Sequence, residues 1–405
     1  MTSTTLIVGA GQAGSDMASA LRQNGYDGRI VLIGEEPAVP YRRPPLSKAF
    51  LSGEVDEASL YIKTREAYAK HDIELRTDVR VAMIHRSAHA VSLADGTQLS
   101  YDKLALTTGG RARRLDLPGA DKPNVFYVRT IDDIRRLREH FNPMQRLVII
   151  GGGYIGLEVA AVGIKSGLEV TLVEAMPRLL ARVTGPELSQ YYDSVHRRHG
   201  VDIRLGVGVQ ALEGDQLAEA VILQDGTRLP ADIVIVGIGL IPNTELAEGC
   251  GLAVDNGILV DLYSQTSDPD ILAAGDCTNH ENGFFGRRMR LESVPNASEQ
   301  ARVAAATICG KRVPHAGVPW FWSDQYNLKL QMVGLSQGHE RIVVRGSMAT
   351  DSFAAFYLQS GVVIAVDAVN RPQDFMLGKK MVAARVQADA AALADESLAL
   401  KSLVP

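Results

Sequence analysis

An α/β fold is predicted by three features of this sequence of 405 residues. A buried strand runs into a glycine-rich turn and a helix close to residue 9, and the same arrangement recurs close to residue 151. Each of these units is followed by the same further features in the same order. The last part of the chain holds both tryptophans and reads as antiparallel strands. We therefore predict two Rossmann-like dinucleotide-binding domains and a C-terminal α+β domain.

The first unit consists of an apolar strand over 5–8 and a helix over 13–22. The turn between them carries Gly9, Gly11 and Gly14 in the pattern G-x-G-x-x-G. Gly9 permits the tight turn, Gly11 lets the backbone approach a pyrophosphate, and Gly14 lets the helix pack against the strand. The free N–H groups of the first helical turn then face the phosphates.

Three features follow the first turn. The strand 29–33 leads to an acidic residue, Glu35, a loop over 40–48 is rich in proline and basic residues, and a hairpin turn stands at Asp95-Gly96. A strand over 103–108 then runs into Gly109-Gly110.

The second unit repeats this order. Its members are the strand 146–150, the glycines Gly151, Gly153 and Gly156, a helix from Leu157, the strand 168–173 ending at Glu174, the hairpin turn Asp225-Gly226 and the strand 233–236 ending at Gly237 and Gly239. Four matched features in one order rarely arise by chance, so the chain contains two dinucleotide-binding modules.

The chain then returns to a short strand that ends in Gly275-Asp276. The segment from Pro319 onward has another pattern: strands are expected over 341–345, 353–358 and 362–369, and a helix begins at Arg371-Pro372. We expect Leu377, Met381 and Val382 to form the buried stripe of this helix, and the last residues to be a loosely held tail.

Composition limits the function classes. The net charge of −5 argues against nucleic acid as the main partner, and the apolar runs are shorter than the roughly 18 residues of a membrane span. The first strand begins too early for a signal peptide, so a cytoplasmic location is expected. The three cysteines form no C-x-x-C pair and cannot hold an iron–sulfur cluster, and no metal site is expected.

Two dinucleotide sites suggest an electron relay from NAD(P)H to a flavin, because a flavin accepts an electron pair and releases single electrons. Asp276 supports this interpretation, since a carboxylate at a strand end can accept hydrogen bonds from the ribityl hydroxyls of FAD, which NAD lacks.

At this point the sequence resembles the two-dinucleotide flavoprotein reductases of the glutathione-reductase fold. Five stretches narrow the resemblance to the oxygenase-coupled ferredoxin reductases: 44–48, 151–158, 237–243, 292–297 and 320–325. The resemblance implies an FAD domain over 1–110 and 247–318, an NAD domain over 111–246 and an interface domain over 319–405. It implies FAD contacts, besides Gly9 and Gly11, at Ala13, Gly14, Glu35, Lys48, Val81, Arg129, Asp276 and Val294.

The NAD site is expected at Gly151, Gly153, Gly156, Glu174 and Gly239. A carboxylate at Glu174 accepts hydrogen bonds from a ribose 2′-hydroxyl and repels a 2′-phosphate, which predicts NADH rather than NADPH. Arg178 and Arg182 lie nearby in the sequence and leave an alternative open, because an arginine accommodates that phosphate.

Four residues are candidates for the catalytic machinery. The resemblance places Lys48 near flavin N5, paired with Glu158, where the two would position the nicotinamide; the alternative for Lys48 is a solvated loop lysine. An aromatic at Tyr154 can cover the flavin or simply pack. The resemblance places Trp322 at the acceptor side, where it shortens the electron path or, like Trp320, only packs.

The loop Pro44-Pro45-Leu46-Ser47-Lys48 lacks the redox-active cysteine of the disulfide reductases of this fold, so electrons must leave for an external acceptor. We expect FAD to pass electrons from NADH to a 2Fe-2S ferredoxin that serves a cytochrome P-450. The alternatives are a rubredoxin reductase, the reductase of a dioxygenase system, and a signalling flavoprotein of the apoptosis-inducing-factor type. Because ferredoxins that serve oxygenases are typically acidic, we expect a basic docking face. Its candidates are Arg302 and Lys329, with Lys63 and the cluster Arg287, Arg288 and Arg290 behind them; each can equally be a solvated charge.

Overall fold

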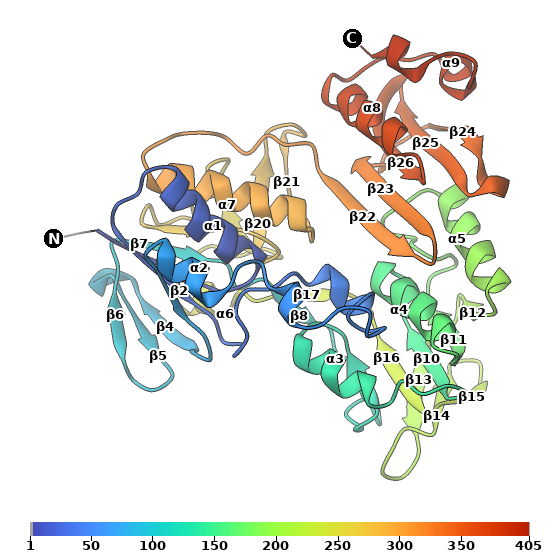
Figure 1. The fold of residues 1–405 in the computed structure, drawn as a ribbon, viewed down its shortest axis with the longest axis horizontal. Coiled ribbons are helices and arrows are strands. Elements are labelled where there is room, and N and C mark those ends of the chain that lie inside the picture. Colours follow the sequence, from blue (N-terminus) through green and yellow to red (C-terminus); the bar gives the residue numbers. More distant parts are fainter. Residues whose placement is uncertain (1–2, 405) are drawn as a thin grey trace. The chain divides into compact units, whose positions relative to one another are not determined.

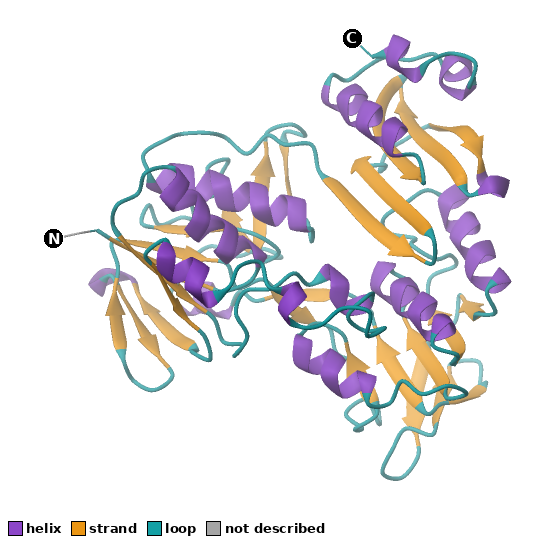
Figure 2. Cartoon of the chain, viewed as in Figure 1, coloured by secondary structure: helices purple, strands orange, loops and turns teal. Residues whose placement is uncertain are grey.

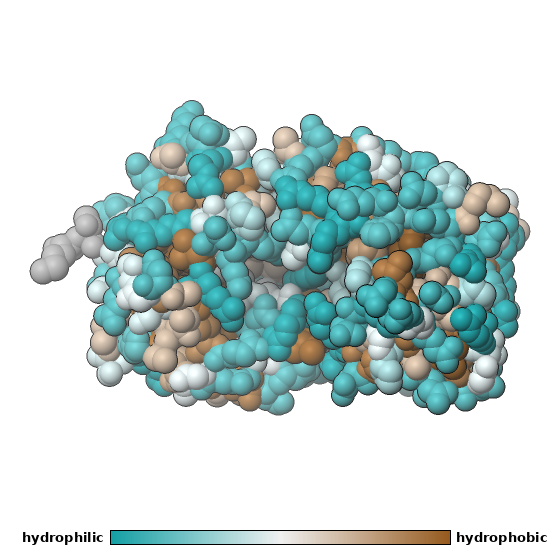
Figure 3. All heavy atoms as spheres, turned by 90° about the horizontal axis from the view of Figure 1, so that it is seen from below, coloured by the Kyte–Doolittle hydropathy of each residue, from teal (hydrophilic) through white to brown (hydrophobic). Residues whose placement is uncertain are grey.

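The computed structural model describes residues 3–404, which fold into two compact units (Figure 1). Unit 1 comprises the chain up to 42, 57–111 and 241–319, and unit 2 comprises 43–56, 112–240 and the chain from 320 onward. The domain boundaries predicted above stay a prediction. Figure 2 shows that strands and helices make up both units, and hydrophilic side chains dominate the face in Figure 3.

Unit 1 is built on a parallel sheet in the order β19-β7-β1-β2-β3. The strands are β1 (Thr4–Val8), β2 (Arg29–Ile33), β3 (Ile73–Arg76), β7 (Lys103–Leu106) and β19 (Ile271–Ala273). Because side chains alternate along a strand, Ile7 faces one core, whereas Leu6 and Val8 face the other. The helices α1 (Gln12–Gln23) and α7 (Val294–Ile308) pack into the core that contains Ile7, where small residues such as Ala301 and Ala304 contribute.

Two small sheets complete unit 1. The elements are β4 (Val81–His85), β5 (Ala90–Leu93) and β6 (Gln98–Ser100) in one sheet, β18 (Ile258–Val260), β20 (Thr278–Asn282) and β21 (Arg287–Met289) in the other, and the short helices α2 (Arg65–Lys70) and α6 (Glu245–Gly249). The predicted turn at Asp95-Gly96 joins β5 to β6, with Gly96 at φ +86° and the Thr97 N–H donating to Asp95 Oδ1 at 2.9 Å.

Unit 2 contains the second parallel sheet, in the order β12-β11-β10-β16-β9. Its strands are β9 (Val125–Tyr127), β10 (Arg146–Ile150), β11 (Glu169–Glu174), β12 (Asp202–Leu205) and β16 (Ile233–Val236), with helices α3 (Ile131–Arg138), α4 (Tyr154–Lys165) and α5 (Pro186–Arg198) and a meander of β13 (Val209–Glu213), β14 (Ala220–Leu223) and β15 (Arg228–Pro230). The run β7-β1-β2-β3 and the run β16-β10-β11-β12 have the same order, so the sequence repeat is a repeat of structure.

The C-terminal part of unit 2 is an antiparallel sheet in the order β22-β23-β26-β25-β24, orange to red in Figure 1. Its strands are β22 (Trp320–Gln325), β23 (Leu328–Gly334), β24 (Arg341–Ser347), β25 (Ser352–Gln359) and β26 (Val362–Val369), covered by α8 (Pro372–Ala383) and α9 (Ala390–Ala394). Elsewhere, β8 (Gly110–Ala112) pairs with β17 (Leu240–Pro242). The predicted α/β fold with a C-terminal α+β part is thus confirmed.

Two details of the C-terminal prediction were wrong. The buried face of α8 is formed by Phe375, Met381 and Val382, while Leu377 is only half-buried. The chain after α8 is not loosely held, because Leu393 and Leu400 are buried. The guanidinium of the buried Arg345 also donates to the carbonyls of Leu393, Asp395 and Leu398 at 2.7 to 3.1 Å. Within the described residues, no helix combines the length and apolar character needed to cross a bilayer.

Candidate functional site

The first glycine turn forms a cradle, by which we mean two closely packed glycines, Gly9 and Gly14, on either side of an open one, Gly11. Gly9 has φ +114°, and a Cβ there would lie 2.2 Å from the Thr107 carbonyl oxygen. A Cβ at Gly14 would lie 2.1 Å from the Gly9 carbonyl oxygen, so both positions exclude any side chain. Gly11 is different: it caps the N-terminus of α1, and nothing lies within 4 Å of a Cβ placed there. The free space lies in front of the first N–H groups of α1, where a pyrophosphate binds in this motif.

The second glycine turn repeats this geometry. Gly151 has φ +114°, and its Cβ would lie 2.4 Å from the Gly237 carbonyl oxygen. A Cβ at Gly156 would lie 2.1 Å from the Gly151 carbonyl oxygen, whereas one at Gly153, the N-cap of α4, meets nothing within 4 Å. The predicted Gly239, with φ +116°, lies beyond the end of β16, the strand next to β10. Each unit therefore has one cradle of this kind, with free space at the N-terminus of a helix.

The acidic strand ends differ between the two modules. Glu35 follows β2 with an exposed side chain that pairs with Arg80 at 3.5 Å. Glu174 ends β11 and is fixed by the backbone: its Oε2 accepts from the Gly152 N–H at 2.6 Å and its Oε1 from the Met176 N–H at 2.8 Å. Glu174 thus lies against the second glycine turn.

The two arginines that left NADPH open are not equivalent. The guanidinium of Arg178 is used inside the loop that follows β11, donating to the carbonyls of Ala181 and Thr184 and to Ser189 Oγ at 2.6 to 2.9 Å. Arg182 is exposed, and its guanidinium nitrogens lie 4.0 Å from a Cβ placed on Gly239. Only Arg182 is therefore placed to meet a group bound near the second turn.

The other predicted FAD residues lie on several elements. Ala13 is buried in α1, Val81 begins β4, Asp276 follows β19, and Val294 begins α7, all in unit 1. Because Asp276 lies just beyond the carboxyl end of a parallel strand, it is at the sheet edge where ligands bind in open α/β sheets. Arg129 precedes α3 in unit 2, and its backbone N–H donates to Asp133 Oδ2 at 3.1 Å.

Lys48 and Glu158 form an ion pair within unit 2. Lys48 ends the short 3₁₀ helix Pro44–Ser47, and its Nζ lies 2.7 Å from Glu158 Oε2. The Lys48 side chain is 19% exposed, and that of Glu158, on α4, is only 2% exposed. A carboxylate this deeply buried needs several partners, because an uncompensated buried charge costs several kcal/mol. The predicted pairing is therefore present and protected from water on the Glu158 side.

Two serines supply the remaining partners of Glu158. Ser47 Oγ donates to Oε2 at 2.5 Å, and Ser323 Oγ on β22 donates to Oε1 at 2.6 Å. The sequence reasoning missed both as site residues. Strand alternation offered a signal for Ser323, because it and Gln325 are the two buried residues of β22. Ser47 directly precedes Lys48, but no sequence pattern showed that the side chains of both residues reach Glu158.

Tyr154 lies one helical turn before Glu158 on the same face of α4. Its hydroxyl donates to Met332 Sδ at 2.9 Å, and its ring lies 4.9 Å from that of Phe321. Burial raises the pKa of this phenol well above its ordinary value, so it stays protonated. All of these contacts lie within unit 2, and both alternatives for Tyr154, a ring that covers the flavin and a packed side chain, stay predictions.

Trp322 belongs to an aromatic row on β22. Its ring lies 5.6 Å from Trp320 and 6.3 Å from Phe321, and all three side chains are half-buried. Trp320 also contacts Phe375 on α8, and Lys379 Nζ lies 5.2 Å from its ring centroid. Trp320 is therefore fixed by packing, while Trp322 lies next to Ser323, the partner of Glu158.

The three cysteines do not form a thiol site. All three are free; Cys277 is buried, and Cys250 and Cys309 are half-buried. Burial raises the pKa of each thiol above its ordinary value. Redox-active cysteines need the opposite shift, because the thiolate is the reactive form.

The docking candidates lie in different settings. Arg302 on α7 and Lys329 on β23 are exposed. In the cluster on and after β21, Arg288 pairs with Glu281 at 2.9 Å and Arg290 with Glu292 at 2.5 Å, which reduces their net positive charge. Lys63 is partly buried and bonds to Ser19 Oγ.

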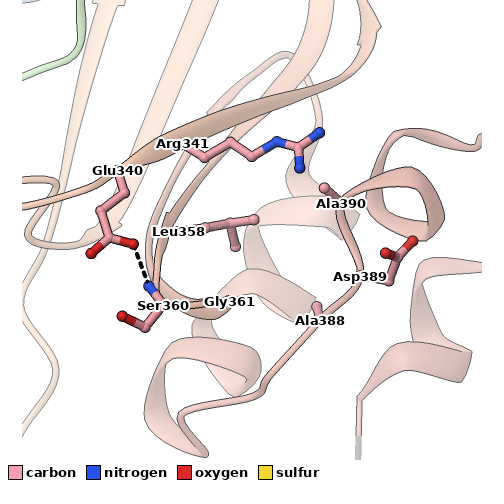
Figure 4. Close-up of a pocket in the computed structure, with 8 residues that line it drawn as sticks. All are labelled: Glu340, Arg341, Leu358, Ser360, Gly361, Ala388, Asp389 and Ala390. Atoms are coloured by element: carbon pink, nitrogen blue, oxygen red, sulfur yellow. Dashed lines mark hydrogen bonds between the residues drawn. The ribbon is translucent and has the colours of Figure 1, made fainter.

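A cavity of about 270 Å³ lies in the C-terminal part of unit 2 (Figure 4). Glu340, Arg341, Leu358, Ser360 and Asp389 contribute to its lining, and the Ser360 N–H donates to Glu340 at 2.8 Å. No lining residue is among the predicted site residues.

Comparison with known proteins places these features in context. Residues 3–301 match the family model of the pyridine nucleotide-disulphide oxidoreductases, and residues 320–404 match a reductase C-terminal model. Putidaredoxin reductase CamA from Pseudomonas putida is 49% identical over 98% of this chain and 96% of its own. The ferredoxin reductase subunit of 5,5′-dehydrodivanillate O-demethylase from a Sphingobium strain is 46% identical over 98% and 97%.

A solved structure gives the same result. The ferredoxin reductase for the CYP199A2 system of Rhodopseudomonas palustris superposes with a TM-score of 0.97 at 43% identity, over 99% of this chain and all of that one (100%). These matches confirm the resemblance that was drawn from the motifs.

Proposed function

The chain belongs to the pyridine nucleotide-disulphide oxidoreductase family and is a ferredoxin reductase, and from this premise we propose that it passes electrons from NADH through FAD to a 2Fe-2S ferredoxin. The family implies FAD and NAD(P)H. The fit to these groups is supported by two cradles in which Gly9, Gly14, Gly151 and Gly156 exclude any Cβ, while Gly11 and Gly153 leave free space at a helix N-terminus.

The observation that carries the proposal is the ion pair between Glu158 on α4 and Lys48, whose loop contains no cysteine. FAD, when bound, takes up two electrons together and releases them singly. In a thiol relay a cysteine would stand beside the flavin, but here the corresponding loop offers Ser47 and Lys48. Lys48 is held by Glu158 and the Pro44 carbonyl, so its ammonium group is fixed in direction and can orient a bound nicotinamide.

We assign the second cradle to NADH rather than NADPH. The Glu174 carboxylate, fixed by two backbone N–H groups, supports a ribose with a free 2′-hydroxyl. Of the two arginines that left NADPH open, Arg178 is engaged by the protein, while the exposed Arg182 keeps NADPH as the alternative nucleotide. The first cradle follows β1, and Asp276 follows β19, two strands away in the same sheet; we assign this cradle to FAD.

We further propose that the ferredoxin serves a cytochrome P-450, as the reductase for the CYP199A2 system does. A ferredoxin of a non-P-450 oxygenase is the second candidate, favoured by the similarity to an O-demethylase ferredoxin reductase subunit. Arg302 and Lys329 are proposed to contact the ferredoxin.

The test is anaerobic mixing of the purified yellow protein with NADH or NADPH while the flavin absorbance is followed. We expect NADH to reduce the flavin, and so to bleach its absorbance, within the time of one catalytic turnover. NADPH should reduce it far more slowly. A protein that holds no FAD, or one that both nucleotides reduce equally well, would refute the assignment of the two cradles.

A further inference from the structure

A chain of buried hydrogen bonds leads away from Glu158 within unit 2. Ser323 Oγ, which donates to Glu158, accepts from Gln325 Nε2 at 3.2 Å. Gln325 Oε1 lies 2.9 Å from His196 Nε2, and His196 Nδ1 lies 3.0 Å from the Tyr326 hydroxyl. Ser323, Gln325 and His196 are each at most 1% exposed. The chain connects β22, the turn after it and α5.

The direction of every bond in this chain follows from Glu158. A carboxylate paired with lysine only accepts, so the single hydroxyl hydrogen of Ser323 must point to it. Ser323 Oγ then accepts from the amide N–H of Gln325, and the carbonyl of Gln325 therefore faces His196. An accepting carbonyl requires a hydrogen on Nε2 of the imidazole.

The last hydrogen bond of this chain, between His196 and Tyr326, also has a defined direction. Burial lowers the pKa of His196 to about 4, so the ring is neutral at pH 7 and carries one hydrogen. With Nε2 protonated, Nδ1 accepts, and the Tyr326 hydroxyl donates to it. The Tyr326 ring is itself stacked on His199 at 3.8 Å between centroids. Four donors in series thus point toward one carboxylate, an arrangement in which each bond polarises the next.

We propose that Gln325 and His196 are positioning residues for the Lys48–Glu158 pair, acting through Ser323 to fix the direction of the Glu158 carboxylate. The inference rests on the proposed function, because the pair is assigned there to orient the nicotinamide. Neither residue touches the pair. Their effect is to remove the alternative rotations of the Ser323 hydroxyl and of the carboxylate, and so to hold Lys48 in one direction.

The first test is a spectroscopic one on the FAD-loaded protein labelled with ¹⁵N-histidine. The signal of His196, assigned by its loss in His196→Gln, should show the Nε2–H tautomer at pH 7. In Ser323→Ala the amide of Gln325 loses its acceptor and is free to turn over, so the Nδ1–H tautomer should appear. An Nδ1–H tautomer in the unmodified protein, or a tautomer unchanged in Ser323→Ala, would overturn the inference.

The second test separates an effect on the position of Lys48 from an effect on the binding of NADH. Gln325→Leu keeps the volume but breaks the chain, and we expect flavin reduction by NADH to slow about tenfold with unchanged affinity for NADH. His196→Phe, which offers no donor, should do the same, whereas His196→Gln, whose amide can still donate to Gln325, should retain most of the rate. Gln359→Leu, at the exposed end of β25, is the matched control.

The outcomes distinguish the two proposals. If NADH fails to reduce the flavin of the unmodified protein, the proposed function is wrong whatever the tautomer of His196. If the unmodified protein is reduced rapidly and Gln325→Leu is equally fast, the function stands and the positioning role is wrong. Should Gln325→Leu not fold, the tautomer measurement still decides.

Discussion

At the scale of the residue, the site depends on how a single buried carboxylate is satisfied. Glu158 meets one ammonium group and two hydroxyls, at 2.5 to 2.7 Å. Removing a partner leaves a charge in a medium where water cannot replace it, so each neighbour affects both stability and the direction of Lys48. Glu174 is half-buried, and two backbone N–H groups hold its carboxylate against the glycine turn.

Replacing Lys48 by alanine should slow flavin reduction by NADH on the order of a hundredfold, since misplacing a reacting group by about 1 Å has an effect of that size. Stopped-flow measurement of the flavin absorbance gives the rate, and Lys70→Ala on the surface of α2 is the control. The double variant Lys48→Met, Glu158→Gln removes both charges. If the double variant regains the rate, the loss in Lys48→Ala comes from the unpaired carboxylate and not from missing positioning.

Replacing Glu174 by glutamine should weaken the preference for NADH over NADPH by tenfold or more in the ratio of kcat/KM values. The reason is Coulomb repulsion, which for two unit charges at 4 Å amounts to about 4 kcal/mol at an effective dielectric constant near 20. Glu169→Gln, exposed at the start of the same strand, should leave the ratio as it is. A ratio that Glu174→Gln leaves unchanged contradicts the assignment of this carboxylate to the ribose.

At the scale of the element, the strand–turn–helix units could be predicted from the sequence, whereas the side-chain contacts between elements could not. The periodicity of the sequence sets which residues of β1 and β10 are buried, and the glycine spacing sets the turns, because both depend on neighbours in the chain. The contacts of Ser323, Gln325 and His196 depend on how β22 packs against α4 and α5. No pattern within any one of these segments contains that information.

The C-terminal errors have the same origin. The tail after α8 appears weakly patterned, yet Arg345 on β24 fixes it through three carbonyl groups. A prediction from the local sequence pattern shows neither that Arg345 is buried nor which carbonyl groups accept its hydrogen bonds. Likewise, Phe375 rather than Leu377 lies on the buried face of α8, because the sheet beneath the helix decides which face is covered.

Strand β20 contributes a pH-sensitive element. His280 on β20 is buried edge-on against His315, with ring centroids 4.8 Å apart, and burial lowers the pKa of His280 to about 3. The unfolded chain, with a histidine pKa near 6.5, binds more protons than the folded protein between these values. The free energy of unfolding therefore has its full value, as far as this group is concerned, above pH 6.5. It decreases as the pH falls toward 3, by up to about 1.4 kcal/mol per pH unit for this group.

Between pH 6.5 and pH 4.5, we expect the thermal unfolding midpoint of His280→Gln to fall by less than that of the unmodified protein. Differential scanning calorimetry of the FAD-loaded protein measures it, and His71→Gln, exposed after α2, is the control. Equal pH slopes in His280→Gln and the unmodified protein would show that this histidine does not carry the effect.

At the scale of the whole molecule, the account is that of an electron relay whose last step is a meeting between two proteins. The net charge of −5 gives no general attraction to an acidic ferredoxin. Docking must therefore depend on local positive charge, for which exposed Arg302 and Lys329 are proposed.

Arg302→Glu and Lys329→Glu should each slow ferredoxin reduction severalfold at low salt, and the rate of the unmodified pair should fall as salt increases, because screening weakens electrostatic steering. Flavin reduction by NADH should not change in either variant. Lys401→Glu, also exposed, serves as the control for a general change of charge. A rate independent of salt would mean that the docking is not electrostatic.

The central claim is that each hydride taken from NADH leaves as two single electrons to a ferredoxin. It is tested most directly by anaerobic titration of a 2Fe-2S ferredoxin with NADH in the presence of a catalytic amount of this protein, following the absorbance of both. The account predicts two ferredoxins reduced per NADH oxidised, at a rate that disappears when the protein is omitted. NADH oxidation without ferredoxin reduction would contradict it.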